Sequence, residues 1–259
     1  PPIHYDMDHN FYIQVSGRKR FVLYPPTEYS KLYLYPRVHP ATRKSQVNFD
    51  SPDLTKTPEY ANINAYEAIV EPGDVLYIPP YWWHKVHALT PSVSIASLSD
   101  SGVDQAMSIL YEKQPLNIDT IEDPKEHKAA TLLFLKALLE KIYGDHQKIT
   151  QRIVDTRWQP LHDEFKYLAA WEDKELCHVV KHVTPEYLAE KRNIDLNRDV
   201  AFTLRRLKRL QMFEGDIVSD KLADVQAIRD IEVEDFVETL IAQAVGVDKL
   251  YPFLRRCML

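Results

Sequence analysis

Cysteine is almost absent from this chain, in which only Cys177 and Cys257 occur among 259 residues. The two lie far apart and outside any Cys-x-x-Cys spacing, so the sequence predicts neither a disulfide framework nor a cysteine-based metal site. A reducing compartment fits this usage. We therefore expect a cytoplasmic or nuclear protein.

Long apolar runs and an excess of positive charge are also lacking. No run approaches the roughly 20 apolar residues that a membrane span needs, and no signal-peptide pattern opens the chain, so no membrane role is expected. The formal net charge of −6 gives no overall attraction to nucleic acid, although local basic patches stay open. The chain starts at Pro1 rather than Met, and we expect that residues upstream were removed or never included.

The apolar pattern divides the chain into two halves. Up to about residue 100, short alternating runs such as Arg18–Tyr24 and Ser92–Ser97 are broken by prolines, which predicts β-strands. Residues 27–64 form a polar insert whose aromatic stretch, Tyr29–Tyr35, is too apolar for a plain linker. Beyond residue 103 the period becomes 3.6, which predicts helices. The predicted domains are 1–102, a β-barrel, and 103–259, all helical.

Helix ends can be read in the second half. Pro124 is expected at the first position of a helix that Gly144 follows, and Thr184-Pro185-Glu186 is expected to start another. The apolar stripes are interpreted mainly as core and otherwise as a partner surface. Residues 205–209, Arg-Arg-Leu-Lys-Arg, give a basic face that is more often solvated than bound to phosphate.

A metal constellation is predicted from spacing on strands. His4 and Asp6 are two residues apart, which on a strand places both on one face. Two histidines and a carboxylate form the facial triad of non-haem Fe(II) sites, which leaves ligand positions open. Taken alone, such a pair is usually two solvated polar residues.

The third ligand is predicted from the segment 71–84, where a Pro-Gly-Asp turn launches an apolar strand and two tryptophans precede His84. On the next strand, His84 shares a face with Val86, while Lys85 and His87 point away. We interpret His87, His9 and His39 as exterior histidines. A zinc site at Cys177, His178 and His182 lacks a further ligand nearby.

Lys19 is a further candidate site residue. It follows a predicted Ser16-Gly17 turn, and its side chain is expected on the same apolar face as Phe21. An inward lysine needs an anion, and a bound dicarboxylate would serve. The alternative is an exposed lysine on a two-faced sheet edge. Asn10 and Tyr12 have even residue numbers, like His4 and Asp6, so on a continuous strand their side chains would lie on the same face and could line the same pocket.

These residues together resemble the JmjC and cupin-like oxygenases, nearest to the asparaginyl hydroxylase branch called factor inhibiting HIF. The matching stretches are His4-Tyr5-Asp6, Asn10-Phe11, Gln14-Val15, Gly17-Arg18-Lys19-Arg20, Pro25-Pro26, His39-Pro40, Arg43, Ser45-Gln46-Val47, Phe49-Asp50, Gly73-Asp74-Val75-Leu76-Tyr77-Ile78-Pro79 and Tyr81-Trp82-Trp83-His84. They cover residues 1 to about 100.

The resemblance implies an α+β chain: a double-stranded β-helix, or jelly roll, followed by the helical region. Because C-terminal helices often build a dimer in such proteins, 232–246 is the first segment to suspect of homodimer formation. It implies Fe(II) bound by His4, Asp6 and His84, and 2-oxoglutarate bound by Lys19 with Asn10 and Tyr12 beside it. O₂ would be the oxidant and ascorbate a supporting reductant. The implied reaction hydroxylates a substrate while 2-oxoglutarate becomes succinate and CO₂.

Several positions depart from the family pattern. Where that branch grips its substrate amide with Arg-Gln, this chain has Arg43-Lys44, so these are the predicted substrate-binding residues but asparagine specificity is not expected. Leu98 replaces an aromatic residue of that branch, and Pro1 stands where relatives often place a hydroxyl for the oxoacid. Ala96 stands where relatives often offer an Asn to the pocket, and the hydroxyl of Ser94 or Ser97 is the candidate to compensate for it. Strands before His4 are missing, so either the chain is a fragment or another segment closes the barrel.

The leading interpretation is a hydroxylase that acts on a protein or peptide side chain. An RNA-modifying hydroxylase and, third, a lysine demethylase share the chemistry. The rival from another class is a non-catalytic cupin-like binding module that acts through its helices. Oxoacid binding discriminates between these two classes.

Overall fold

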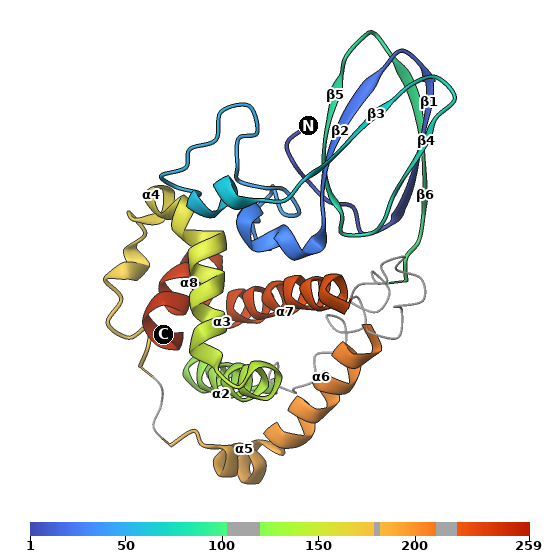
Figure 1. Ribbon diagram of the computed structural model, residues 1–259. Helices are drawn as coiled ribbons and strands as arrows, with labels where there is room; N and C mark the ends of the chain where they lie inside the picture. Colours follow the sequence, from blue (N-terminus) through green and yellow to red (C-terminus); the bar gives the residue numbers. More distant parts are fainter. Residues whose placement is uncertain (103–119, 179–181, 211–221) are drawn as a thin grey trace. The chain divides into compact units, whose positions relative to one another are not determined.

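The computed structural model describes residues 1–102, 120–178, 182–210 and 222–259 (Figure 1). The chain forms two compact units. The β unit comprises Pro1–Tyr35, His39–Met107 and Leu210–Glu232, and the helical unit comprises Pro36–Val38, Ser108–Arg209 and Val233–Leu259. The predicted domain boundary after residue 102 stays a prediction.

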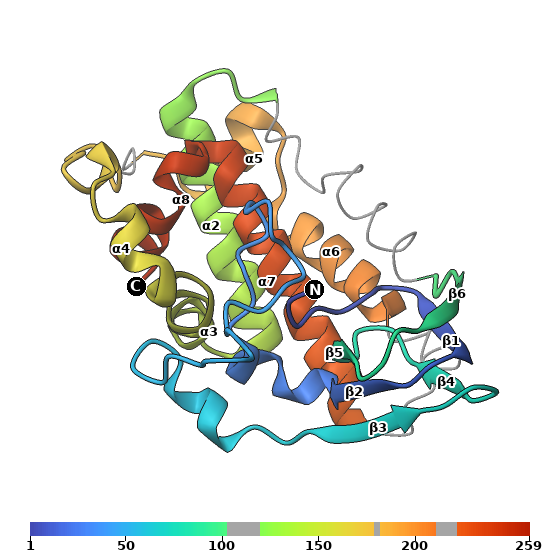
Figure 2. The same cartoon turned by 90° about the horizontal axis from the view of Figure 1, so that it is seen from above.

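The β unit contains two antiparallel sheets of three strands each, with the strand orders β4-β1-β6 and β3-β2-β5. The strands are β1 (His9–Ser16), β2 (Lys19–Tyr24), β3 (Tyr66–Val70), β4 (Val75–Ile78), β5 (Trp83–Ala88) and β6 (Val93–Ser99). Gly17 makes the predicted turn between β1 and β2 with a φ of 69°, and a Cβ there would collide with the carbonyl of Pro91. The pairing of β1 with β6 can be followed in Figure 2.

The two sheets face each other across an apolar core. Phe21 and Leu23 of β2 pack with Val70 and Ile78, and Tyr12 of the opposite sheet packs against them. The rings of Tyr12 and Phe21 lie 4.8 Å apart between centroids. The alternation predicted for β2 therefore holds, because its odd-numbered residues point between the sheets.

Isolated β-bridges extend the second sheet beyond β5. His4 pairs with His84 on one side and with Lys44 on the other, and Leu34 pairs with Ser45. The segment that carries His4 therefore lies between β5 and residues 43–45. The insert supplies this extension, and its stretch Tyr29–Tyr35 is largely buried, as the aromatic content predicted.

The outer face of the β4-β1-β6 sheet is apolar and exposed among the described residues. Phe11, Val15, Val75, Val93 and Ile95 expose between 44% and 60% of their surface.

The helices are α2 (Pro124–Tyr143), α3 (His146–Ile153), α4 (His162–Phe165), α5 (Pro185–Arg192), α6 (Leu196–Leu210), α7 (Leu222–Val245) and α8 (Val247–Phe253). The predicted ends of α2 are confirmed: Asp123 caps it ahead of Pro124, and Gly144 follows with a φ of 77°. Thr184 caps α5, also as predicted. No described helix has the length and apolarity of a membrane span.

The apolar stripe of 232–246 is buried in the chain itself, as the core interpretation predicts; Val233, Val237 and Ile241 are inaccessible. A homodimer through this segment stays a prediction. In α6, Leu207 is buried while Arg205 and Lys208 are exposed, which fits a solvated basic face. The side chains of Arg209 and Leu210 lie outside the described ones.

A buried ionic cluster surrounds Arg157 in the helical unit. Its guanidinium lies 2.9 Å from Glu234, 2.5 Å from Asp235 and 3.1 Å from Glu238. Burial opposes the charge of Arg157, but these carboxylates raise its pKa well above the usual value. Burial raises the pKa of Glu238 to about 7, although Arg157 opposes the shift. Trp158 also donates to Glu238, at 2.6 Å.

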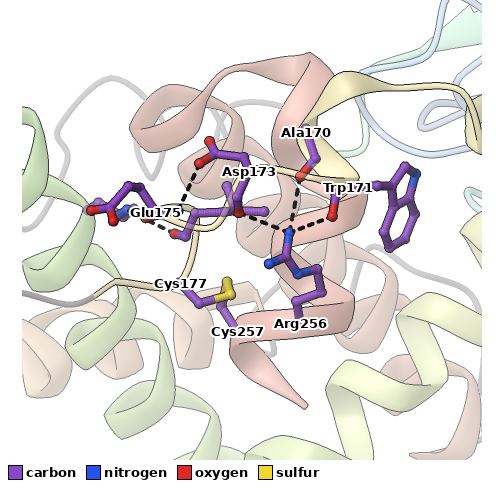
Figure 3. The surroundings of a disulfide bond; sticks show 9 residues. Ala170, Trp171, Asp173, Glu175, Cys177, Arg256 and Cys257 are labelled. Atoms are coloured by element: carbon purple, nitrogen blue, oxygen red, sulfur yellow. Dashed lines mark hydrogen bonds between the residues drawn. A yellow bond between two sulfur atoms is a disulfide. The ribbon is translucent and has the colours of Figure 1, made fainter.

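The expectation that the cysteines would form no disulfide is wrong for this structure. Cys177 and Cys257 are bonded to each other although 80 positions separate them (Figure 3). The reason is tertiary: the C-terminal helical turn returns to residues 170–177, where Arg256 donates hydrogen bonds to the carbonyls of Ala170, Trp171 and Asp173. Cys177 is consequently no metal ligand. The cysteines no longer argue for a reducing compartment.

Candidate metal centre

His4, Asp6 and His84 converge in the β unit. Their potential ligand atoms all lie within 4.8 Å of one another, and among the described residues this is the one such group of three. The Nε2 atom of His84 lies 3.7 Å from a carboxylate oxygen of Asp6, and the two imidazole centroids are 4.3 Å apart. Direct pairing of His4 with His84 places both side chains on one face of the sheet.

The backbone orients both imidazoles. The Nδ1 atom of His4 donates to the carbonyl of Pro2 at 2.9 Å, and that of His84 donates to Trp82 at 3.1 Å. Because the N–H of each ring is on Nδ1, the lone pair of Nε2 is left to bind a metal. Metal-binding histidines are usually held in this way. Burial, and then the neighbouring His4, lower the pKa of His84, so its neutral form is favoured.

Asn10 joins this group through Asp6. Its side-chain nitrogen donates to the Asp6 carboxylate at 3.4 Å, and only 7% of the residue is exposed. Its Oδ1 atom is buried and has no hydrogen-bond partner among the described residues. A buried orphan acceptor beside a carboxylate and two imidazoles fits a site that a cation and its ligands complete.

Lys19 points between the sheets, and its ammonium donates to the hydroxyl of Tyr12 at 2.6 Å. The same ammonium lies 5.1 Å from the centre of the Tyr12 ring. No carboxylate of the described residues lies within the 4 Å that would make an ion pair with it. The Lys19 ammonium inside the barrel is thus hydrogen-bonded to a neutral phenol, and an anionic ligand would supply the opposite charge.

Arg43 and Lys44 lie beside the metal-ligand segment. The carbonyl of Arg43 accepts a hydrogen bond from Tyr5, and Lys44 pairs with His4. Both side chains are exposed, so either can meet a substrate.

Three other histidines stay out of the group, as predicted. His9 bonds the hydroxyl of Tyr77, His39 accepts from the amide of Ala41, and the His87 ring contacts Phe49. Across β1 and β6, Ala96 pairs with Tyr12, which places it at the pocket. The hydroxyl of Ser94 is held by Gln14 at 2.7 Å.

Tyr81 is an anchor that the sequence did not reveal. Its amide donates to the carbonyl of Asp6 at 2.8 Å, and its hydroxyl donates to the buried Glu232 at 2.6 Å. Its ring stacks on Tyr5, between the two ligands of the first segment. Glu232 is 151 positions away, so no local pattern marks the pair.

Residues 2–115 match the family described as the cupin-like domain. This match and the two antiparallel sheets confirm the predicted fold class of a jelly roll followed by helices.

The relatives of this domain are of the JmjC type. Similar proteins are the JmjC domain-containing protein D of Dictyostelium discoideum, 40% identical over 94 residues, and the lysine-specific demethylase JMJ30 of Arabidopsis thaliana, 40% identical over 95. The tRNA wybutosine-synthesizing protein 5 of Gallus gallus is 45% identical over 83. These matches cover 36%, 37% and 32% of the chain but 21%, 22% and 24% of the relatives' length. They do not place the chain in the asparaginyl hydroxylase branch, which stays a prediction.

Proposed function

We propose that the cupin-like domain is an Fe(II)- and 2-oxoglutarate-dependent oxygenase that hydroxylates a side chain of a protein or peptide. The observation that carries the proposal is the combination of His4, Asp6 and His84 with the inward Lys19. A metal triad alone fits many sites, but an ammonium inside the same barrel supplies the anion-binding group that an oxoacid needs.

Each residue has a role in this proposal. His4, Asp6 and His84 hold the metal; when bound, Fe(II) supplies the activation of O₂ that is coupled to the decarboxylation of 2-oxoglutarate. Lys19 and Tyr12 bind the distal carboxylate of the oxoacid, and Asn10 fixes the Asp6 carboxylate. The packed Phe21 and Leu23 keep water from the inner end of the pocket. Arg43 and Lys44 face the substrate, and the site of action is cytoplasmic or nuclear.

One relative favours a second candidate. The protein from Gallus gallus is named for tRNA wybutosine synthesis, so an RNA substrate of the same oxygenase chemistry is the alternative to a protein side chain. A demethylase, as in the Arabidopsis relative, would use the same triad. A non-catalytic module would bind no oxoacid.

The test is turnover of labelled 2-oxoglutarate by the protein with Fe(II), ascorbate and O₂. We expect succinate and CO₂ to form, slowly without substrate, and to disappear in Asp6→Ala but not in His87→Ala. His87 is the matched control because it lies on β5 with His84 but on the opposite face. Absence of succinate from the unaltered protein, together with no binding of an oxoacid analogue, would leave the proposal without support.

A further inference from the structure

A cavity of about 490 Å³ opens beside the metal-ligand segment in the β unit. The side chains on its wall that carry recognisable chemistry are Tyr35, Lys44, Gln46, Asn48, Phe49 and Lys85. Its size lies within the range of pockets that hold small ligands or single side chains, roughly 300–1,000 Å³.

Two of its walls come from the segments that position the proposed ligands. Lys44 pairs with His4, and Lys85 follows His84 directly on β5. Lys85 faces away from His84 on β5, so the cavity opens behind the metal-ligand segment, on the face of the sheet opposite the metal ligands.

The cavity is cationic. Lys44 and Lys85 are on its wall, and no Asp or Glu is among the described residues that line it. The Lys85 ammonium donates to the carbonyl of Pro1 at 2.9 Å and lies 5.7 Å from the centre of the Phe49 ring. Neither lysine makes an ion pair with a described carboxylate, so two positive charges remain for an anionic ligand.

The aromatic side chains of the cavity are already engaged. Tyr35 stacks on His39 with 4.5 Å between ring centroids, and Phe49 lies against His87 at 5.2 Å with Lys85 over its face. Single-stranded nucleic acid binds largely by stacking its bases on open aromatic faces, together with broad positive charge. The engaged rings favour a compact carboxylate over a nucleotide, which would need open aromatic faces.

We propose that this cavity binds an acidic side chain, Asp or Glu, of the protein substrate, at a position removed from the residue that is oxidised. The proposal rests on the proposed function, because its ligand is part of the substrate. Lys44 and Lys85 supply the two ammonium groups, and Asn48 lies beside them as an amide donor. The substrate class is thus an acidic peptide.

The test measures binding of a short labelled Glu-rich peptide by fluorescence anisotropy, alongside a Lys-rich peptide and an oligouridine of equal length. The variants are Lys44→Glu and Lys85→Glu, and the matched control is Lys56→Glu, an exposed lysine of the same insert away from the cavity. We expect each cavity variant to weaken binding of the Glu-rich peptide by about tenfold or more. Lys56→Glu should leave it unchanged. Lys44→Gln and Lys85→Gln, with thermal melting as a check of folding, should weaken it less.

The other outcomes contradict the proposal. Equal weakening by Lys56→Glu would show non-specific attraction, tighter binding of oligouridine through the same lysines would assign the cavity to RNA, and no binding of the Glu-rich peptide would leave the cavity without this role. Binding of an oxoacid analogue to the Fe(II)-loaded protein is measured in parallel. Analogue binding without peptide binding overturns this inference alone, whereas peptide binding without analogue binding overturns the proposed function alone.

Discussion

Charged groups inside the β unit and inside the helical unit are satisfied in opposite ways. Around Arg157 in the helical unit, three buried carboxylates surround one guanidinium, and the indole N–H of Trp158 donates to one of these carboxylates. Inside the barrel, Lys19 meets only a phenol among the described residues, and the Oδ1 atom of Asn10 has no partner.

The difference separates structural polar groups from binding groups. A buried charge that is fully bonded within the chain fixes the packing of the elements around it. A buried charge or acceptor that lacks its counterpart costs free energy in the absence of a ligand, so it is retained where a ligand completes it. By this criterion the barrel interior is a site and the Arg157 cluster is a framework.

The largest effect is expected at the metal ligands. Asp6→Ala or His84→Ala should reduce Fe(II) affinity by more than about 100-fold, beyond the loss typical of residues that only orient ligands. Metal titration with a spectroscopic Co(II) or Fe(II) signal measures this. His87→Ala, on the opposite face of β5, should retain wild-type affinity. Equal losses in His84→Ala and His87→Ala would contradict the assignment of His84.

Lys19→Ala should have the second-largest effect on binding. We expect it to weaken binding of an oxoacid analogue by roughly 2–5 kcal/mol while metal binding is retained, because the distal carboxylate loses its charged partner. Calorimetric titration of the Fe(II)-loaded protein gives both quantities. Arg20→Ala, which removes an exposed ion pair with Glu67 on the other face of β2, is the matched control. Unchanged analogue binding in Lys19→Ala would show that Lys19 is no oxoacid ligand.

In the helical unit, substitution of Arg157 should affect stability instead of binding. Arg157→Met leaves Glu234, Asp235 and Glu238 without their common cation and should lower the free energy of unfolding by roughly 3–5 kcal/mol. Urea denaturation measures the loss, and Arg20→Met serves as the exposed comparison, with a much smaller effect. A loss in Arg157→Met no larger than that in Arg20→Met would mean that the cluster is no framework.

The disulfide should contribute a comparable or slightly smaller amount. Cys177→Ser opens a loop of 80 positions and should cost about 2–4 kcal/mol of stability in oxidising buffer. Addition of a thiol reductant should remove the difference between the variant and the wild type. Peptide mapping without reduction identifies the bond directly; recovery of Cys177 and Cys257 as free thiols from the oxidised protein would refute it.

The stability of the helical unit should also depend on pH. Glu238 has a folded pKa of about 7 against an ordinary value of 4.5, so the folded state holds its proton more tightly than the unfolded state. Below pH 4.5 the carboxyl is protonated in both states. Stability then falls as pH rises from 4.5 to about 7, and the loss is complete above that. Thermal melting should show a shallower decline in Glu238→Gln; an identical decline would exclude Glu238 as its source.

Local patterns sufficed for the β unit. The inward face of Lys19 follows from residue spacing on β2, because side chains alternate with a period of two. His4 and Asp6 converge as their spacing predicted, although His4 forms only an isolated bridge and Asp6 lies outside the strands. The caps of α2 are equally local, since Asp123 and Gly144 act within one turn of the helix ends.

Long-range pairs were beyond sequence reasoning. The bond between Cys177 and Cys257, the contact of Tyr81 with Glu232 and the cluster of Arg157 join residues 77 or more positions apart. Their spacing carries no period, and their partners are fixed only when the elements pack. The cavity at Lys85 was missed for the same reason, because its wall combines β5 with the pairing of the insert to His4.

The central claim is that the polar groups left incomplete inside the barrel bind Fe(II) and an oxoacid. Crystals soaked without oxygen in Fe(II) and an unreactive 2-oxoglutarate analogue test this directly. The account predicts metal density bonded to His4, Asp6 and His84, with the distal carboxylate of the analogue paired to Lys19 and Tyr12. Metal bound elsewhere, or an analogue that leaves Lys19 and Tyr12 bonded only to each other, would contradict it.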